Sequence, residues 1–469
     1  MANSQTLRVA IITENFLPKI DGVTVTLAHL LGYLNAQGVK TMLLGPASGM
    51  TEYEGCRLFS APGFPLKAYP GLKINFIPPS FIQALREFNP TIIHLIDPIW
   101  LGVQALLVAK IFFPGVPLIT SHDTNLPTYA TIFGFPYSRK RGWQILSYFH
   151  SLAKFTLAPS PSTATLLRQK GYANLRICGR GFPESFSPVL RSPTTRQRWG
   201  IKLNDVAVLS VGRLSPEKNL HLLVESFSLL SPLIKARAVL IFVGDGPLAT
   251  SLRRLCTSKN VRAVFLGQLT GAALAEAFAS ADIMNSPSFT ETFGQVTLEA
   301  MASGLPIVGL YAEGTVDLVT HLKNGLLLDV HADATWNPYV APDQTKATIA
   351  CYDSCADLMH PSSGAFGIIA TRYAMLLELV IADSTLRGNM GAVALSRAQE
   401  YPWDRCMRHI LDAYIDASRD QYFGKQPHRG SKAGFLQFVA DAIGIGFAIL
   451  VAALSHILYM VPTFDDLCT

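Results

Sequence analysis

The chain has 469 residues, enough for two or three domains with cores of their own. Hydrophobic residues make up 49% and charged residues only 15%, which excludes global disorder and suggests a contact with a membrane. The net charge of +6 comes without a long basic run, which argues against nucleic acid as a partner. The seven cysteines lack zinc-site spacing and indicate reduced thiols in a cytosolic compartment.

The first part of the chain alternates apolar, strand-like runs with helical patterns. The expected strands are 7–13, 40–45, 91–95 and 118–120. Because strands that alternate with helices form parallel sheets covered on both faces, residues 1–180 are predicted to form a doubly wound α/β domain. After the first strand, Asp21 and Gly22 precede a helix, and a glycine there lets the backbone approach a ligand.

The same rhythm restarts near residue 206 and predicts a second doubly wound domain over residues 199–385. Its expected strands are 206–212, 238–244, 263–267, 283–285 and 306–309. Residues 181–198 contain three prolines and few apolar side chains, and we interpret them as the linker. Residues 332–365 fit neither rhythm and are expected to be an insertion or a loop. Ligands tend to bind in a cleft at the carboxyl ends of such strands.

The strongest local pattern is Val-Gly-Arg-Leu-Ser-Pro-Glu-Lys-Asn-Leu at 211–220. Arg213 follows an expected strand, and Lys218 precedes an expected helix. Two cations at the mouth of a strand suit a diphosphate, because charge-assisted contacts to phosphate oxygens are strong. The alternative interpretation is an exposed loop with ordinary surface charges.

A second pattern covers residues 288–301 and contains two glutamates. A helix is expected to begin near Gly294, where the first backbone N–H groups favour an anion. Glu291 precedes this helix and Glu299 lies in its second turn. A carboxylate beside a phosphate site needs another partner, and sugar hydroxyls are the natural candidates. Alternatively, Glu291 interacts with the helix dipole and Glu299 lies on a solvated helix face.

Together with residues 244–247 (Gly-Asp-Gly-Pro), interpreted as a structural turn, these motifs in this order resemble the retaining nucleotide-sugar glycosyltransferases of family 4. The resemblance covers roughly residues 7–330 and resumes at about 375–415, and closing helices are expected over 386–423. It implies the GT-B fold, an α/β architecture in which two Rossmann-like domains face a cleft.

The resemblance also implies roles for the motif residues. Arg213 and Lys218 would hold the diphosphate of the donor, and Glu291 would contact the transferred sugar. Glu299 would bind the ribose. The cations would stabilise the negative charge that builds on the leaving diphosphate, commonly the largest contribution to catalysis.

Backbone contacts to the donor are expected from Phe293 and Gly294, and from Gly22 in the first domain. Neither a resident cofactor nor a metal ion is expected, since no Asp-x-Asp cluster accompanies the cleft motifs. The donor phosphate itself would take the proton of the acceptor hydroxyl, as the resemblance implies.

The segments 13–18 and 21–24 look like the opening of GDP-mannose-dependent α-mannosyltransferases, a subgroup that is similar to the sulfoquinovosyltransferases. Residues 121–129 match the acceptor-side loop of this subgroup. Many members have His-Thr where this chain has Asp-Thr, and the histidine here lies one place earlier. His122 and Asp123 are therefore both candidates for the residue that faces the reacting carbon.

The expected reaction moves a hexose, with mannose favoured, from GDP-mannose or a UDP-sugar to a hydroxyl of a lipid or another hydrophobic acceptor. A sulfoquinovosyl- or glucosyltransferase that uses a UDP-sugar is one alternative. A glycosyltransferase for small soluble metabolites is another, and a non-catalytic protein that binds sugar nucleotides is the third.

Residues 442–461 contain no Asp, Glu, Lys or Arg, and as a helix they would cover about 30 Å, the thickness of a bilayer core. Three basic residues precede the segment, and the positive-inside rule then keeps the catalytic part in the cytosol. We expect a single-pass anchor, with the endoplasmic reticulum as the membrane. The alternative is a buried C-terminal helix.

Overall fold

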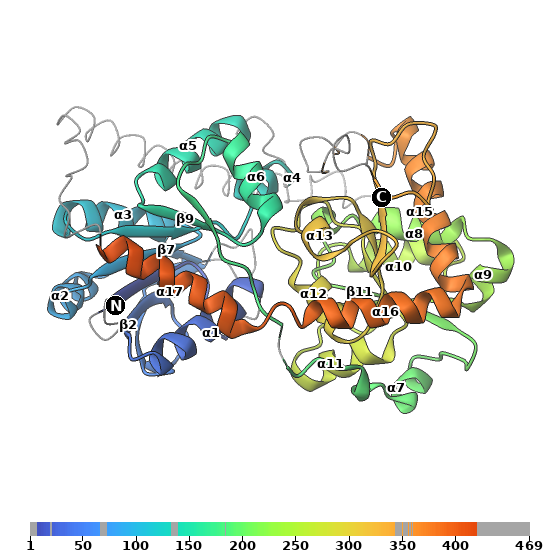
Figure 1. Ribbon diagram of the computed structural model, residues 1–469, viewed down its shortest axis with the longest axis horizontal. Coiled ribbons are helices and arrows are strands. Elements are labelled where there is room, and N and C mark those ends of the chain that lie inside the picture. Colours follow the sequence, from blue (N-terminus) through green and yellow to red (C-terminus); the bar gives the residue numbers. More distant parts are fainter. Residues whose placement is uncertain are drawn as a thin grey trace, which may run out of the picture. The chain divides into compact units, whose positions relative to one another are not determined.

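The computed structural model describes residues 7–419 except 19–20, 66–72, 133–138, 183, 343–348, 350–354, 356–357 and 359. These residues form two compact units, shown with their elements in Figure 1. Unit 1 contains residues 7–159, 164–178 and 404–419 of the described chain, and unit 2 contains 160–163 and 179–403. The predicted alternation of strands and helices is confirmed in both units.

Unit 1 is built on an eight-stranded sheet with the order β10-β9-β8-β7-β1-β2-β4-β3. Its strands are β1 (Arg8–Thr13), β2 (Lys40–Pro46), β3 (Glu52–Tyr53), β4 (Cys56–Ala61), β7 (Ile92–Ile96), β8 (Leu118–Ser121), β9 (Phe155–Ala158) and β10 (Leu175–Ile177). All neighbours are parallel except β3 and β4. The strand order reverses between β1 and β7, which makes the carboxyl ends of these two strands the switch point of the sheet.

Helices connect the strands of unit 1. They are α1 (Gly22–Ala36), α2 (Pro79–Phe88), α3 (Trp100–Phe112), α4 (Leu126–Ile132), α5 (Arg139–Ser151) and α6 (Pro161–Gln169), and a hairpin of β5 (Gly63–Pro65) and β6 (Lys73–Asn75) precedes α2. Helix α17 (Trp403–Arg419) returns to this unit. The Tyr414 hydroxyl lies 2.8 Å from Nδ1 of buried His94, so the returning helix is tied to the centre of the sheet.

Unit 2 has a six-stranded, fully parallel sheet with the order β13-β12-β11-β14-β15-β16. Its strands are β11 (Val206–Val211), β12 (Ala238–Val243), β13 (Ala263–Phe265), β14 (Ile283–Ser286), β15 (Ile307–Leu310) and β16 (Gly325–Leu328). Its helices are α7 (Pro193–Arg198), α8 (Leu220–Ser228), α9 (Pro232–Arg237), α10 (Ala249–Ser258), α11 (Gly271–Ser280), α12 (Gln295–Ala302), α13 (Glu313–Leu318), α15 (Gly364–Ala382) and α16 (Ser384–Ala398), with short 3₁₀ turns η3 (Pro188–Leu190) and η4 (Pro216–Lys218).

The sheet of unit 2 is buried on both faces. Along β11, Val206 and Val208 pack into one apolar cluster with α8, α10 and α15, while Ala207 and Leu209 pack into another with α11 and α12. Strands covered on both sides read as continuous apolar runs, which explains why the sequence reveals them so clearly. Here the order reverses between β11 and β14, so the loops after these two strands diverge.

Among the described residues, one helix, α15, is long and apolar enough to cross a membrane. Half of its apolar stretch is buried inside the protein. The Tyr373 hydroxyl on this helix donates to the Val308 carbonyl and the Asn285 side chain at 3.0 and 3.1 Å. This contact is that of a core helix. The predicted anchor at 442–461 lies outside the described residues, so it stays a prediction.

Candidate active site

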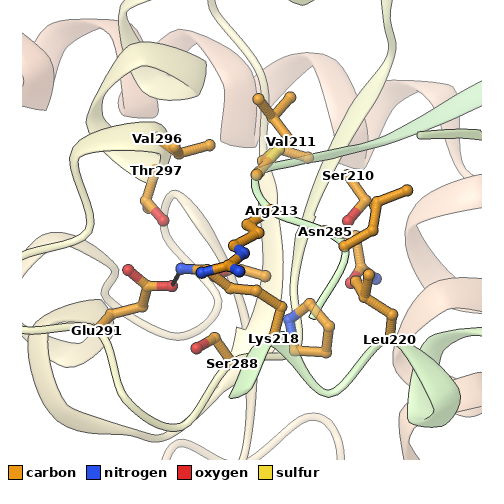
Figure 2. Close-up of a pocket in the computed structure, with 15 residues that line it drawn as sticks. Ser210, Val211, Arg213, Lys218, Leu220, Asn285, Ser288, Glu291, Val296 and Thr297 are labelled. Carbon is orange, nitrogen blue, oxygen red and sulfur yellow. Dashed lines mark hydrogen bonds and ion pairs between the residues drawn. The ribbon is translucent and has the colours of Figure 1, made fainter. Parts of the chain in front are cut away.

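The carboxyl ends of β11 and β14 surround a pocket in unit 2 (Figure 2). Its empty space, including the part open to solvent, is about 400 Å³. The lining residues are Ser210, Val211, Gly212, Arg213, Leu214, Lys218, Leu220, Met284, Asn285, Ser286, Pro287, Ser288, Glu291, Val296 and Thr297. The structure thus brings Arg213, Lys218 and Glu291 together, although 78 positions separate the first from the last.

The loop that carries Arg213 is held by close backbone packing. Gly244 has a φ of +128°, and a Cβ there would lie 2.0 Å from the Gly212 carbonyl oxygen. The Leu214 N–H donates to the Asp245 carbonyl at 3.0 Å. The glycine-rich turn at 244–247 therefore supports the Arg213 loop, and only a residue without a side chain fits at Gly244.

Lys218 and Glu291 form an ion pair across the pocket. The Lys218 Nζ lies 2.5 Å from Oε1 of Glu291, as the dashed line in Figure 2 marks. Burial raises the pKa of the Glu291 carboxyl, but the Lys218 charge and hydrogen bond, the Ser288 hydroxyl and the Arg180 charge together hold the pKa below its ordinary value. Glu291 is therefore ionised at neutral pH.

The guanidinium of Arg213 points toward the same part of the pocket as Lys218 and Glu291 (Figure 2). Arg213 is exposed, and its neighbours Leu214 and Ser215 are buried. The backbone of the loop is thus fixed while the cation faces solvent. Two cations at one switch point make this part of unit 2 suited to an anion.

Helix α12 begins at the pocket. Its N-cap residue, Gly294, has a φ of +91°, and no side chain of the described residues hydrogen-bonds to the first turn as a cap. Phe293 is buried against Tyr401, with ring centroids 6.2 Å apart, and the Gln295 side chain donates to the Gly181 carbonyl at 3.1 Å. The start of the helix is held in place, and its first N–H groups add partial positive charge near Glu291.

Glu299 lies in the second turn of α12 and does not line the pocket. Burial raises the pKa of its carboxyl to about 7, although a hydrogen bond with Gln295 lowers it. Glu299 is therefore half-protonated near neutral pH, unlike Glu291. Its assignment to the ribose of a donor stays a prediction.

The remaining predicted residues belong to unit 1. Gly22 is the first residue of α1, which Asp21 caps by accepting hydrogen bonds from the backbone of Val23 and Thr24. His122 is buried, and its ring stacks on that of Trp143 with the centroids 5.8 Å apart. Its Nε2 lies 3.0 Å from Oδ1 of Asn125, within a hydrogen bond.

Burial lowers the pKa of His122, which keeps its ring neutral. The next residue, Asp123, is only partly buried. Of the two candidates for the acceptor-side loop, Asp123 therefore has the more accessible side chain.

Sequence reasoning missed two charged residues beside these positions. Arg180 is 6% exposed and close enough to Glu291 to depress its pKa. Asp97 is also 6% exposed and accepts hydrogen bonds from the backbone of Asp123 and Thr124. The sequence signal for Arg180 is a charged residue between two glycines. The signal for Asp97 is an Asp-Pro pair directly after an apolar run.

Two family profiles match the chain, "Glycosyltransferase Family 4" over residues 20–183 and "Glycosyl transferases group 1" over residues 191–340. A GDP-mannose-dependent alpha-mannosyltransferase of Mycobacterium tuberculosis is 34% identical over 337 residues, which cover 69% of this chain and 84% of that protein. The chain belongs to glycosyltransferase family 4. The predicted family and the predicted enzyme class are confirmed.

Other relatives of this glycosyltransferase differ in their named activities. The sulfoquinovosyl transferase SQD2 of Arabidopsis thaliana is 32% identical over 69% of this chain and 63% of its own length. The alpha-monoglucosyldiacylglycerol synthase of Acholeplasma laidlawii is 24% identical over 69% of this chain and 85% of its own. Membership of the family therefore does not fix the donor or the acceptor, because the named activities differ among these relatives.

Solved structures support the predicted GT-B type of α/β fold. The Anabaena protein HepE, solved in complex with UDP-glucose, has a TM-score of 0.62 and 19% identity, and covers 87% of this chain and all of its own. A sucrose-phosphate synthase from Thermosynechococcus elongatus has a TM-score of 0.66 and 17% identity, and the match covers 88% of this chain and all of that protein. At such identities the likeness concerns the fold alone.

Proposed function

We propose that this glycosyltransferase binds a nucleoside-diphosphate sugar in the pocket of unit 2 and transfers the sugar, with retention, to an acceptor hydroxyl. The observation that carries the proposal is the convergence of Arg213, Lys218 and Glu291 at the start of α12. Cations and helix N–H groups suit the diphosphate, and an ionised carboxylate suits sugar hydroxyls.

The Lys218–Glu291 ion pair has a consequence for donor binding. Lys218 contacts Glu291 in the protein without ligand, so an entering diphosphate competes with Glu291 for the same ammonium group. When Lys218 turns to the phosphate, the nearby Arg180 keeps a positive charge beside Glu291. The carboxylate then remains ionised and available to the hydroxyls of the transferred sugar.

The chemistry follows from where charge develops. As the bond between the sugar and the diphosphate breaks, negative charge grows on the leaving group, where Arg213 and Lys218 stabilise it. A departing phosphate oxygen takes the proton of the acceptor hydroxyl, and the hydroxyl oxygen forms the new bond to the sugar. The residues of this chain supply the charge in this scheme, with no resident cofactor.

Mannose from GDP-mannose is the favoured donor sugar, because two mannosyltransferases with this donor in their names are 34% and 33% identical to the chain. A UDP-sugar that carries glucose or sulfoquinovose is the alternative donor, and the names of two other relatives support these two sugars. For the acceptor we favour a lipid or another hydrophobic hydroxyl, which the name of the diacylglycerol-directed relative supports.

A panel of labelled sugar nucleotides, incubated with the purified chain in detergent and a whole lipid extract, tests this proposal. We expect one donor to label a lipid and Glu291→Gln to abolish the labelling. Glu225→Gln is the matched control, because Glu225 pairs with Lys259 at 2.9 Å in the same unit, away from the pocket. Labelling only of water-soluble compounds contradicts the lipid acceptor, and turnover by Glu291→Gln contradicts the site.

We further propose that residues 442–461 anchor the enzyme in a membrane, most simply that of the endoplasmic reticulum, with the catalytic part in the cytosol. Sugar nucleotides made in the cytosol would then reach the pocket directly. The full-length chain should stay with membranes after alkaline extraction, while residues 1–432 should become soluble and still bind donor. A full-length chain that alkaline treatment releases contradicts the anchor.

A further inference from the structure

Asp97 occupies a special position in unit 1. It follows β7 directly, at the switch point where the order of the sheet reverses. Its φ of +44° lies in the left-handed region, which residues with side chains adopt rarely, and its side chain is buried. Strained backbone of this kind persists where the surroundings enforce it and is concentrated at functional sites.

The carboxyl group of Asp97 accepts hydrogen bonds from two consecutive residues, Asp123 and Thr124. Its Oδ1 accepts from the backbone N–H groups of Asp123 and Thr124, at 2.7 and 3.1 Å. Its Oδ2 accepts from the Thr124 hydroxyl at 2.5 Å. Both oxygens therefore hold the backbone and side chain of the loop that follows β8.

This arrangement is unfavourable for stability in two respects. The carboxylate is buried, and the carboxylate of Asp123 lies close by, so that burial first and the neighbouring charge second raise the pKa of Asp97. A buried carboxyl group and a strained backbone at the residue that holds the Asp123–Thr124 backbone thus point to a positioning function.

We propose that Asp97 is a positioning residue for the reaction, which fixes the Asp123–Thr124 backbone so that the Asp123 side chain keeps one orientation toward the reacting sugar or acceptor hydroxyl. The inference rests on the proposed function and deepens it. It assigns unit 1 a geometric role in the chemistry, carried by hydrogen bonds from a residue that does not touch substrate. Small displacements of a reacting group reduce rates strongly, about 10²-fold for 1 Å.

Asp97→Gly and Asp97→Asn test the inference as a pair. Glycine accepts the left-handed backbone without strain and removes all three hydrogen bonds. Asparagine keeps them, because its amide oxygen accepts from both N–H groups and its amide nitrogen donates to the Thr124 hydroxyl. We expect kcat to fall about 10²-fold in Asp97→Gly and to recover to within about tenfold in Asp97→Asn, with the donor KM nearly unchanged in both.

Two further variants separate positioning from stability. Thr124→Val removes one of the three hydrogen bonds and should reduce kcat less than Asp97→Gly does. Asp205→Ala removes a buried carboxylate that holds the Lys202 N–H at 3.0 Å in unit 2, so it should lower the melting temperature but leave kcat unchanged in the cold. Hydrogen exchange at the Asp123 and Thr124 amides should accelerate in Asp97→Gly and not in Asp97→Asn.

The outcomes are distinguishable. A wild-type kcat for folded Asp97→Gly, or unchanged amide exchange at Thr124, overturns the inference even when the wild type is active. An Asp97→Asn variant as slow as Asp97→Gly also overturns it, because charge rather than geometry is then the contribution. A wild type that turns over no nucleotide sugar counts against the proposed function, and the exchange measurement still decides whether Asp97 holds the loop.

Discussion

The two sheets reverse their strand order in the same way, yet acidic residues follow the strands at one switch point and basic residues predominate at the other. In unit 1 the strands at the reversal, β1 and β7, are followed by the carboxylates Glu14 and Asp97. In unit 2 the loops after β11 and β14 bring two cations, Arg213 and Lys218, together with Glu291. The same topology therefore provides an acidic site in one unit and an anion-binding site in the other.

The helix N-termini show the same contrast. In unit 1, Oε1 of Glu14 accepts from the Leu101 and Gly102 N–H groups at 2.5 and 3.1 Å, so a side chain occupies the anion position of α3. In unit 2, α12 starts at Gly294 without a side-chain cap among the described residues. Unit 1 thus fills a helix N-terminus with its own carboxyl group, whereas the uncapped start of α12 is what the proposed donor site in unit 2 requires.

The largest expected effect comes from removing a cation in unit 2. Lys218→Ala should reduce kcat about 10²–10³-fold, because a contact to charge that develops in the transition state contributes about 3–4 kcal/mol. Lys259→Ala is the matched control, since it breaks another Lys–Glu pair of unit 2. Steady-state kinetics with the preferred donor gives the answer. A kcat of Lys218→Ala within threefold of the wild-type value would contradict a catalytic role for the cations at the switch point of unit 2.

Arg180 should matter less than Lys218, and in a pH-dependent manner. Arg180→Met keeps a long side chain but removes the charge beside Glu291, so the pKa of Glu291 rises. Activity that requires ionised Glu291 then falls, by about tenfold, and more at low pH than at high pH. A kcat profile between pH 5 and 8 measures this shift. If the acidic limb of the profile stays where the wild type has it, Arg180 does not act on Glu291.

Gly294→Ala tests the open start of α12. Alanine at a φ of +91° is strained by about 1–2 kcal/mol, and its Cβ would lie 3.3 Å from Leu318. The helix start should shift and the donor KM should rise about fivefold. Gly200→Ala shares the strain, at a φ of +70° with no atom within 4 Å of the new Cβ, but lies away from the pocket. Equal donor KM values for the two variants would show that the helix start does not bind donor.

The sequence predicts the cationic site better than the acidic one. Arg213, Lys218 and Glu291 lie in the loops that follow apolar strand runs, and parallel strands bring such loops to one edge. Long-range packing is not visible in that pattern. It places His122 against Trp143, sets Glu299 off the pocket lining and brings Arg180 beside Glu291. The sheets were therefore predictable from local periodicity, and the electrostatic partners were not.

The smallest effect on activity is expected at Glu14, which acts on the stability of unit 1. Burial raises the pKa of Glu14 from about 4.5 to about 7, even though four backbone hydrogen bonds from residues 99–102 lower it. A carboxyl with a raised folded-state pKa binds more protons in the folded than in the unfolded chain between these two values. Its contribution to stability is therefore complete below about pH 4.5 and is lost as the pH rises through about 7.

Glu14→Gln should remove this loss, because an amide oxygen still accepts from the Leu101 N–H but carries no charge to desolvate. We expect the free energy of unfolding to rise by up to about 3 kcal/mol at pH 8, since the 2.5 pKa units between 4.5 and about 7 correspond to about 1.4 kcal/mol each, and by less than about 1 kcal/mol at pH 5. Urea titrations at the two pH values measure the difference, with Glu225→Gln as a partly exposed control. A variant less stable at pH 8 would mean that the negative charge of Glu14 is itself needed at the N-terminus of α3, so that unit 1 binds an anion there as strictly as unit 2 is proposed to bind its donor.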